Sequence, residues 1–320
     1  MRRKRIGQLG FDDAMVRVPR GRDALGEIDR LVDWAPLERL LDPIHASARG
    51  EPAYPPLMMF KVLLLQRWHG LSDPQMEAAL ADRLSFLRFA GLSLDDETPD
   101  HSTIWRFRER LTKDGLADAL FAAVLAQVTA CGLVLRHGTL IDASLVTSAA
   151  RRPRMDEGKT SATDPDARFG AANERRRYVF GYKAHVAVDE GSGLVRALVT
   201  TPANVQEIDI AGRLVPADAG TVYADRGYDA RRLREDLAAR GLGCGIMRRG
   251  QKGRPLSEAE RAANHALSLV RRNVERVFGT MKRSYRMARL RAFSLARNHV
   301  DLTLFVIALN LRRWVRLATP

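Results

Sequence analysis

Three acidic residues have types and settings that could support metal-dependent phosphoryl chemistry. Asp142 lies within the apolar run Thr139–Val146, where a carboxylate is costly to bury unless it is paired, hydrogen-bonded or bound to a metal. Asp225 ends the apolar run Val222–Ala224, and Glu275 belongs to a long amphipathic helix. Each residue also has an ordinary structural interpretation, as a turn cap or as half of an Arg–Glu pair on a solvated helix face.

Together, the three carboxylates fit a site for divalent cations. If two strands and a facing helix bring them to one sheet edge, their oxygens suit Mg²⁺, with Mn²⁺ as a substitute. Two such ions about 3.5–4 Å apart can activate water or a 3′-hydroxyl and stabilise the leaving oxygen of a phosphodiester. Arg271 and Lys282, four residues before and seven after Glu275, share its helical stripe, and we expect them to approach phosphates.

The elements that must position these residues change in kind near residue 136. Before it, amphipathic and capped segments predict helices at 37–41, 57–68, 74–87, 103–111 and 116–131. After it, apolar and alternating runs predict strands at 139–146, 178–189, 194–200, 221–224 and 244–247, and helices at 207–214, 230–240 and from 257 onwards. We therefore expect a helical DNA-binding or dimerisation region over residues 1–135 and an α/β catalytic domain with basic C-terminal helices over residues 136–320.

The order of elements in the second half indicates a fold class. Three strands are followed by helix, strand, helix, strand and helix, which matches the ribonuclease H-like arrangement of a mixed sheet with flanking helices. The alternation of helices and strands predicts parallel pairing there. The polar, Arg-rich segment Arg151–Arg177 predicts a loop or disordered insertion, which we expect to contact DNA. Lys183 and His185 share a strand face and are expected either to approach DNA or to be exposed.

A basic charge balance indicates a polyanionic partner. The 320 residues include 52 Lys plus Arg against 38 Asp plus Glu, which gives +14 at pH 7. The last 73 residues, from Arg248, hold 17 of the basic residues and four of the acidic ones. Neutralising phosphates releases counterions, so such a surface favours nucleic acid, with a generally basic proteome as the alternative explanation.

Cysteine usage and hydropathy argue against several classes of protein. Cys131 and Cys244 are far apart and lack metal-ligand spacing, which disfavours structural zinc and a disulfide framework. No apolar signal core follows the charged start Met1–Arg5, and the longest apolar stretches are too short to span a bilayer. We expect a cytoplasmic protein with no membrane partner.

The segment Arg271–Lys282 carries a specific resemblance. Its Arg, Glu and Lys match the signature around the third acidic residue of bacterial insertion-sequence transposases in the family four/five superfamily, while Ser268 stands where that signature has Tyr. Thr139–Ser144 resembles the strand that carries the first catalytic aspartate in this family. Tyr223–Tyr228 resembles the segment around its second aspartate. The resemblance extends over nearly the whole chain and is closest to insertion-sequence family five.

This resemblance implies a DNA transposase of the three-carboxylate (DDE) type. It implies that Asp142, Asp225 and Glu275 are catalytic metal ligands for Mg²⁺-dependent cleavage and for strand transfer by the freed 3′-hydroxyl. The implied partner is double-stranded DNA, as terminal inverted repeats and as target. Candidate DNA contacts are Arg271, Lys282, Lys183, Tyr182 and Arg226.

Further expectations concern the assembly and the size of the catalytic domain. Because two element ends must be brought together, we expect a homodimer or larger complex on DNA, in a bacterial, nucleoid-associated setting. Only 49 residues separate Asp225 from Glu275, which leaves no room for the large β-rich insertion of family-four members. Two other functions stay open at this point: a catalytically inactive DNA-binding regulator of the element, and a nuclease without strand transfer.

Overall fold

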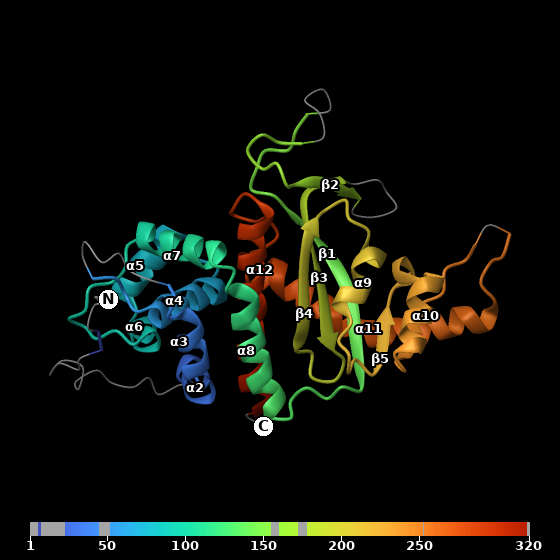
Figure 1. Cartoon of the computed structure of the whole chain (residues 1–320), viewed down its shortest axis with the longest axis horizontal. Helices are drawn as coiled ribbons and strands as arrows, with labels where there is room; N and C mark the ends of the chain where they lie inside the picture. Colours follow the sequence, from blue (N-terminus) through green and yellow to red (C-terminus); the bar gives the residue numbers. More distant parts are fainter. Residues whose placement is uncertain are drawn as a thin grey trace. The chain divides into compact units, whose positions relative to one another are not determined.

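The chain folds into two compact units, which we describe separately. The computed structural model describes residues 6–7, 23–44, 52–154, 160–171, 178–251 and 253–318. One unit comprises Met1–Cys131 with Thr303–Pro320, and the other comprises Gly132–Leu302. Figure 1 shows helices in the first unit and a sheet with flanking helices in the second. The predicted strands and helices that would carry the acidic residues are all present in the second unit.

The first unit is helical in its described residues. Its helices are α2 (Ala24–Leu31), α3 (Ala35–Leu41), α4 (Pro56–His69), α5 (Asp73–Asp82), α6 (Leu84–Ala90), α7 (His101–Lys113) and α8 (Ala117–Ala130). The single helix predicted over 74–87 is wrong, because Arg83 adopts an extended conformation between α5 and α6. The break leaves Leu84 exposed and buries Phe86 and Leu87, so packing against the rest of the unit overrides the local helical period.

The C-terminal helix α12 (Leu295–Ala318) contributes its residues from Thr303 onward to the helical unit. The indole Nε1 of Trp68 on α4 donates a hydrogen bond to the Ala308 carbonyl at 2.7 Å. The side chains of Trp68 and Ala308 are both buried. This differs from the expected division at residue 135, which assigned the whole C-terminus to the catalytic domain. From Thr303 onward, α12 carries buried apolar side chains such as Phe305, Ile307 and Leu311, and this part belongs to the helical unit.

The second unit contains a six-stranded mixed sheet. Its strands are β1 (Gly138–Thr147), β2 (Arg168–Ala171), β3 (Tyr178–Asp189), β4 (Val195–Pro202), β5 (Thr221–Ala224) and β6 (Gly243–Ile246). β3 pairs antiparallel with β1, β2 and β4, whereas β1–β5 and β5–β6 are parallel. The predicted parallel pairing is therefore confirmed. β2 lies within the segment 151–177 that was predicted to be a loop, so that prediction is wrong for Arg168–Ala171.

Helices flank this sheet. They are α9 (Glu207–Leu214), the 3₁₀ turn η1 (Arg226–Tyr228), α10 (Arg231–Ala239) and α11 (Glu258–Gly279), which continues into the π-helical turn η2 (Thr280–Ser284). Residues of α9 and α10 form a buried core with Ile141 on β1. Because side chains alternate along a strand, the next residue, Asp142, is directed to the opposite face.

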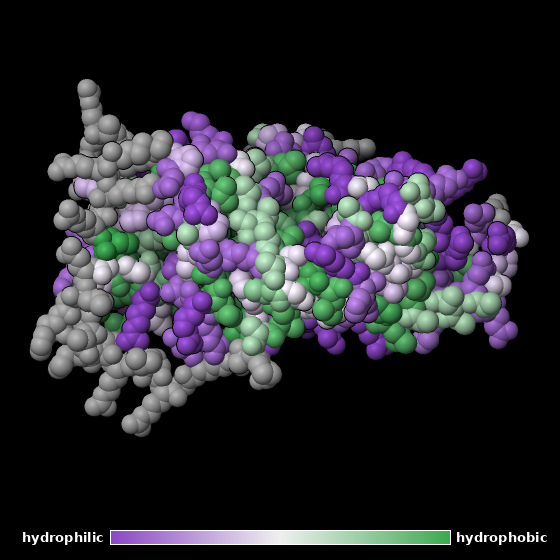
Figure 2. All heavy atoms as spheres, turned by 60° about the horizontal axis from the view of Figure 1, so that its bottom comes forward, coloured by the Kyte–Doolittle hydropathy of each residue, from purple (hydrophilic) through white to green (hydrophobic). Residues whose placement is uncertain are grey.

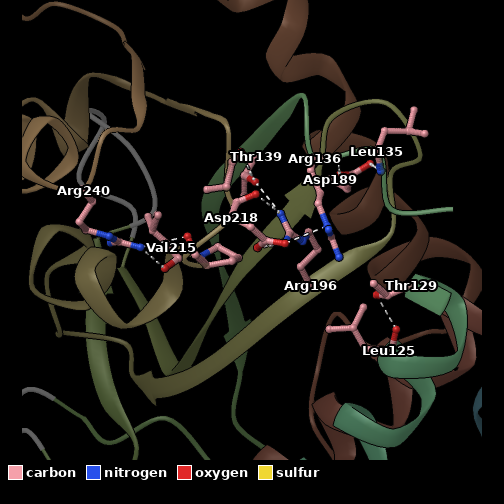
Figure 3. Close-up of polar contacts among 12 residues, drawn as sticks. Leu125, Thr129, Leu135, Arg136, Thr139, Asp189, Arg196, Val215, Asp218 and Arg240 are labelled. Carbon is pink, nitrogen blue, oxygen red and sulfur yellow. Dashed lines mark hydrogen bonds and ion pairs between the residues drawn. The ribbon is translucent and has the colours of Figure 1, made fainter. Parts of the chain in front are cut away.

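A cluster of polar contacts holds the amino end of β1 (Figure 3). The Arg136 backbone N–H donates to the Asp189 carboxylate at 3.0 Å, and the Arg136 guanidinium pairs with Asp218 at 2.9 Å. Arg196 on β4 also pairs with Asp218 and donates to the Thr139 hydroxyl at 3.2 Å. These contacts join β1, β3, β4 and the loop before β5, so they fix the strand that carries Asp142.

Hydrophilic and hydrophobic residues are interspersed over the face drawn in Figure 2. Several large apolar side chains are exposed, including Trp105 at 50% and Leu269 at 46%. Among the described residues, no helix combines the length and apolar character that crossing a membrane requires.

Candidate active site

Two of the predicted acidic residues come together at one edge of the sheet. The β1–β5 register pairs Leu140 with Tyr223, and continuing it by two residues brings Asp142 level with Asp225. Asp225 caps the turn that follows β5, since its Oδ1 accepts a hydrogen bond from the Gly227 N–H at 2.8 Å. The position of Asp225 after a parallel strand is the one at which open α/β sheets bind their ligands.

Arg271 on α11 is the charge partner of Asp142. Its Nη2 donates to Asp142 Oδ2 at 3.0 Å, and the side chains are only 14% and 17% exposed, respectively. The Arg271 Nε is buried and has no hydrogen-bond partner among the described residues. Arg271, which was predicted to approach phosphates, therefore lies beside Asp142 and neutralises its carboxylate.

A fourth carboxylate, which the sequence analysis missed, lies at the same edge. Glu207 is the first residue of α9, and a Cβ atom at residue 227 would lie 3.5 Å from Glu207 Oε2 and 2.9 Å from Asp225 Oδ1. Glu207 Oε1 pairs with Lys183 Nζ at 3.2 Å, and the same Nζ donates to the Val205 carbonyl at 2.9 Å. Lys183 was predicted to contact DNA, but its side chain is 12% exposed and is engaged inside the protein.

The topology contains a signal that could have identified Glu207. β4 runs antiparallel to β3, which runs antiparallel to β1, so β4 has the same direction as β1 and β5. The residues that follow β4 and β5 therefore reach the same edge of the sheet. The sequence analysis treated Glu207 only as part of the helix predicted over 207–214. Its position after β4 indicates that it lies at the edge of the sheet where Asp225 lies.

Burial and neighbouring negative charges raise the pKa values of Asp142 and Tyr228 at this edge. The pKa of Asp142 is raised to about 6, mainly by burial and in smaller part by the charges of Asp225 and Glu207, against the opposing effect of the Arg271 guanidinium. Burial also raises the pKa of the Tyr228 hydroxyl well above its usual value, with additional effects of Glu207 and of both aspartates. Tyr228 is fully buried, and its hydroxyl has no hydrogen-bond partner among the described residues. The site thus concentrates carboxylates in a desolvated setting, as functional sites often do.

Glu275 lies on α11, one helical turn beyond Arg271, and is exposed. In the part of the chain that the structure describes, no group of three or more His, Cys, Asp or Glu side chains is arranged to hold a metal ion. Lys282 is not in α11 but in the π-helical turn η2, where burial lowers its pKa. The predicted common stripe assumed a continuous α-helix, so the wider turn changes the direction of Lys282 relative to Glu275.

The other predicted DNA contacts lie in different surroundings. Tyr182 is fully buried, and its hydroxyl donates to Asp164, so its side chain does not reach the surface. His185 is likewise buried and contacts Thr201, which rules out the exposed alternative for it. Arg226 is exposed in the turn after Asp225. Much of the predicted DNA-contacting segment 151–177 lies outside the described residues, namely 155–159 and 172–177.

A divalent cation that bound beside Asp142 and Asp225 would meet oxygen donors. Asp225 and Glu207 lie near enough to Asp142 to raise its pKa, and carboxylate oxygens suit Mg²⁺ or Mn²⁺ better than zinc. The raised pKa of Asp142 and the two cationic side chains at the site indicate excess negative charge, which a bound cation would neutralise.

Comparison with protein families is consistent with this chemistry. Residues 136–311 match the family described as "Transposase DDE domain". Residues 12–110 match the family described as "Transposase domain (DUF772)". No solved structure matches the chain significantly.

Proposed function

The chain belongs to the transposase DDE-domain family, and from this we propose that it cuts DNA at the ends of its insertion element and joins the 3′-hydroxyl ends to target DNA. The family membership makes it a DNA transposase, with DNA as its partner. The resemblance of its motifs supports insertion-sequence family five as the group within the superfamily.

The observation that carries this proposal is the convergence of Asp142 and Asp225. Their strands are parallel neighbours, their register makes them level, and Asp142 is desolvated strongly enough to raise its pKa to about 6. We assign Asp142 and Asp225 to the binding of Mg²⁺, or Mn²⁺ as a substitute. When bound there, such ions supply activation of the attacking oxygen and stabilisation of the leaving oxygen.

We assign Glu275 as the third catalytic carboxylate. It follows Arg271 by one turn of α11, about 6 Å along the helix axis, and Arg271 contacts Asp142. Its exposure leaves the carboxylate accessible to a bound DNA strand and its counterions. Arg271 itself holds the α11 face against the strand that carries Asp142, and the exposed Arg226 is available to a phosphate beside Asp225.

A ribonuclease H-like fold for the second unit is supported by its strand order. Without β2, the order is β4-β3-β1-β5-β6, with antiparallel pairing among the first three strands and parallel pairing among the last three. For the helical unit we propose DNA binding or dimerisation, and for the active form a dimer or larger assembly on paired ends.

The test is a Mg²⁺-dependent cleavage and joining assay on DNA with the flanking element ends. Asp142→Asn, Asp225→Asn and Glu275→Gln are each expected to abolish cleavage while leaving end binding intact. Joined products from the native protein alone establish the three-carboxylate mechanism. Cleavage without joining identifies a nuclease, and tight end binding without cleavage identifies an inactive regulator; either result overturns the proposal.

A further inference from the structure

Asp164 is fully buried and joins three segments of the second unit beyond the carboxyl end of β1. Its Oδ2 accepts a hydrogen bond from the Ser148 hydroxyl at 2.5 Å, and its Oδ1 accepts one from the Ser294 backbone N–H at 3.0 Å. The Tyr182 hydroxyl on β3 also donates to Oδ1. Because a buried carboxylate without hydrogen bonds is costly, moving any of these segments away from Asp164 carries a large penalty.

The chain that continues from α11 through η2 is attached at the same place. Thr147, the last residue of β1, donates its N–H to the Ala288 carbonyl at 3.2 Å and accepts from the Leu290 N–H at 2.8 Å. Between these two residues, the Arg289 guanidinium donates to the Ser148 carbonyl at 3.2 Å. The chain beyond α11 is therefore bound to the end of β1, next to the serine that Asp164 holds.

The same short stretch also holds the start of α12. Ser294 donates to Asp164, and the Leu295 N–H donates to Asp166 Oδ2 at 2.8 Å. A helix start needs such acceptors, because its first N–H groups have no partner within the helix. The connection between η2 and α12 is thus held by β1 at its middle and by the two aspartates at its end.

We infer that Asp164 is a positioning residue for Glu275, because it holds the chain beyond α11 against β1. This inference rests on the proposed function, in which Glu275 is the third catalytic carboxylate. Glu275 is exposed, so its place beside Asp142 depends on where α11 lies on the sheet. Arg271 attaches α11 to β1 one turn before Glu275. The contacts of Asp164 support the second attachment, beyond η2, so the helix is fixed on both sides of Glu275.

Two competing explanations make different predictions. If Asp164 only stabilises the fold, variants that remain folded keep α11 in place and cleave DNA at the native rate. If Asp164 acts through its charge, Asp164→Asn is as inactive as Asp164→Ala. If it positions α11 through hydrogen bonds, Asp164→Asn retains most of the activity. The amide oxygen still accepts from Tyr182 and Ser294, and the amide nitrogen can donate to Ser148 Oγ.

The first measurement is the distance between nitroxide labels on α11 and on the sheet, by double electron–electron resonance on the full-length protein. Cys244 on β6 is exposed and takes one label. Arg276→Cys, next to Glu275 on the exposed side of α11, takes the other. The other cysteine of the chain, Cys131, is replaced by serine. Asp164→Ala is expected to shift or broaden the distance distribution, and Asp164→Asn to leave it unchanged.

The second measurement is Mg²⁺-dependent cleavage of end DNA in single turnover, with unlabelled protein. Asp164→Ala is expected to cleave at least about tenfold more slowly at saturating DNA, since small misplacements of a reacting group are costly. The DNA concentration that gives half the maximal rate should change little. Ser148→Ala removes one of the hydrogen bonds and should show smaller effects in the same direction, which decides the matter if Asp164→Ala does not fold.

Asp189→Ala is the matched control. Asp189 is also fully buried, and it accepts hydrogen bonds from the Arg136 N–H at 3.0 Å and the Ser192 hydroxyl at 2.7 Å. It pairs with Thr139 at the amino end of β1, the opposite end from Asp164 (Figure 3). We expect it to lower stability, with native label distances and a native cleavage rate in the folded protein. Urea unfolding in EDTA verifies that each variant is folded.

The outcomes separate this inference from the proposed function. Altered label distances and slow cleavage in Asp164→Ala, restored in Asp164→Asn and absent in Asp189→Ala, support the inference. Native distances and native cleavage in folded Asp164→Ala and Ser148→Ala overturn it and leave the proposed function standing. Native distances in an inactive Asp164→Asn also overturn it, in favour of a role for the charge. Altered distances in Asp164→Ala, with no cleavage by the native protein, overturn the proposed function and support Asp164 as the residue that positions α11.

Discussion

The Arg271 guanidinium on α11 lies 3.0 Å from the Asp142 carboxylate on β1, and both side chains are largely buried. This ion pair connects the helix that carries Glu275 to the strand that carries the first aspartate. It also provides a counter-charge for a carboxylate whose pKa burial has raised to about 6. Arg271 therefore has a structural role in the metal-free protein in addition to any contact with phosphate.

Replacement of Arg271 is expected to destabilise the metal-free protein. Arg271→Met leaves the Asp142 carboxylate desolvated and without its partner, which should cost about 1–3 kcal/mol. Urea unfolding in EDTA at pH 7.5 measures this cost. In the Asp142→Asn background the same substitution should cost less, because no charge is left behind. Equal costs in the two backgrounds would show that the ion pair does not contribute.

A methyl group at residue 227 is expected to impair the site without unfolding the protein. In Gly227→Ala the new Cβ lies 2.9 Å from Asp225 Oδ1, so this oxygen must shift, whereas its distance of 3.5 Å from Glu207 Oε2 is an ordinary contact. We expect lower Mn²⁺ affinity and slower Mg²⁺-dependent cleavage. Gly212→Ala is the control, because Gly212 lies in α9 with open space around its Cβ position and should gain about 0.5–1 kcal/mol of stability. Native cleavage by Gly227→Ala would show that the position of Asp225 Oδ1 does not limit the reaction.

His185 is expected to make stability depend on pH. Burial, with a smaller effect of Lys183, lowers the pKa of His185 from 6.5 to about 4. The unfolded state then binds more protons between these values, so stability is fully present above about pH 6.5 and falls as the pH falls towards 4. The loss reaches at most about 3 kcal/mol.

Urea unfolding between pH 7.5 and 4.5 tests this dependence by comparison with His185→Gln, which should lose less stability over the same range. The comparison is needed because burial and the charges of Arg312 and Arg83 also lower the pKa of His69 to about 4 in the helical unit. Identical pH profiles for the native protein and His185→Gln would refute the assignment to His185.

An Arg-lined cavity next to α10 is expected to bind DNA phosphates. It has a volume of about 520 Å³, and its lining includes Arg248, Arg249 and Arg254. The backbone N–H groups of Arg248 and Arg249 donate to Asn264 and Asp229, respectively, so the loop is held while its guanidinium groups are exposed. These exposed guanidinium groups can neutralise phosphates, although Asp229, Glu235 and Glu260 also line the cavity.

Alanine replacement of the three arginines should weaken binding to any duplex. Each lost phosphate contact should also reduce the slope of log K against log salt concentration by about 0.9. Filter-binding titrations at several salt concentrations measure both quantities, with replacement of the exposed α9 residue Arg213 by alanine as a control. An unchanged salt slope would exclude this cavity as a phosphate-binding surface.

The sequence by itself predicted most of the elements, including those that position Asp142 and Asp225, but it merged α5 with α6 and missed β2. Periodicity, caps and turn residues are local, so they predicted the strand that carries Asp142, the strand that ends just before Asp225 and the helix that carries Glu275. The Ser257 capping box, for example, is present at the start of α11 as its spacing indicates. The parallel pairing of β1 with β5 followed from the alternation of helices and strands.

Only the tertiary structure decided which side chains meet. The closeness of Glu207 to Asp225, and the pairing of Lys183 with Glu207 in place of DNA, depend on the return of β4 to the same sheet edge. The burial of Tyr182 depends on a hydrogen bond to Asp164, 18 residues earlier in the chain. Such contacts arise from strand register and chain crossings, which join residues far apart in sequence. Local patterns of hydrophobicity and charge therefore do not predict these contacts.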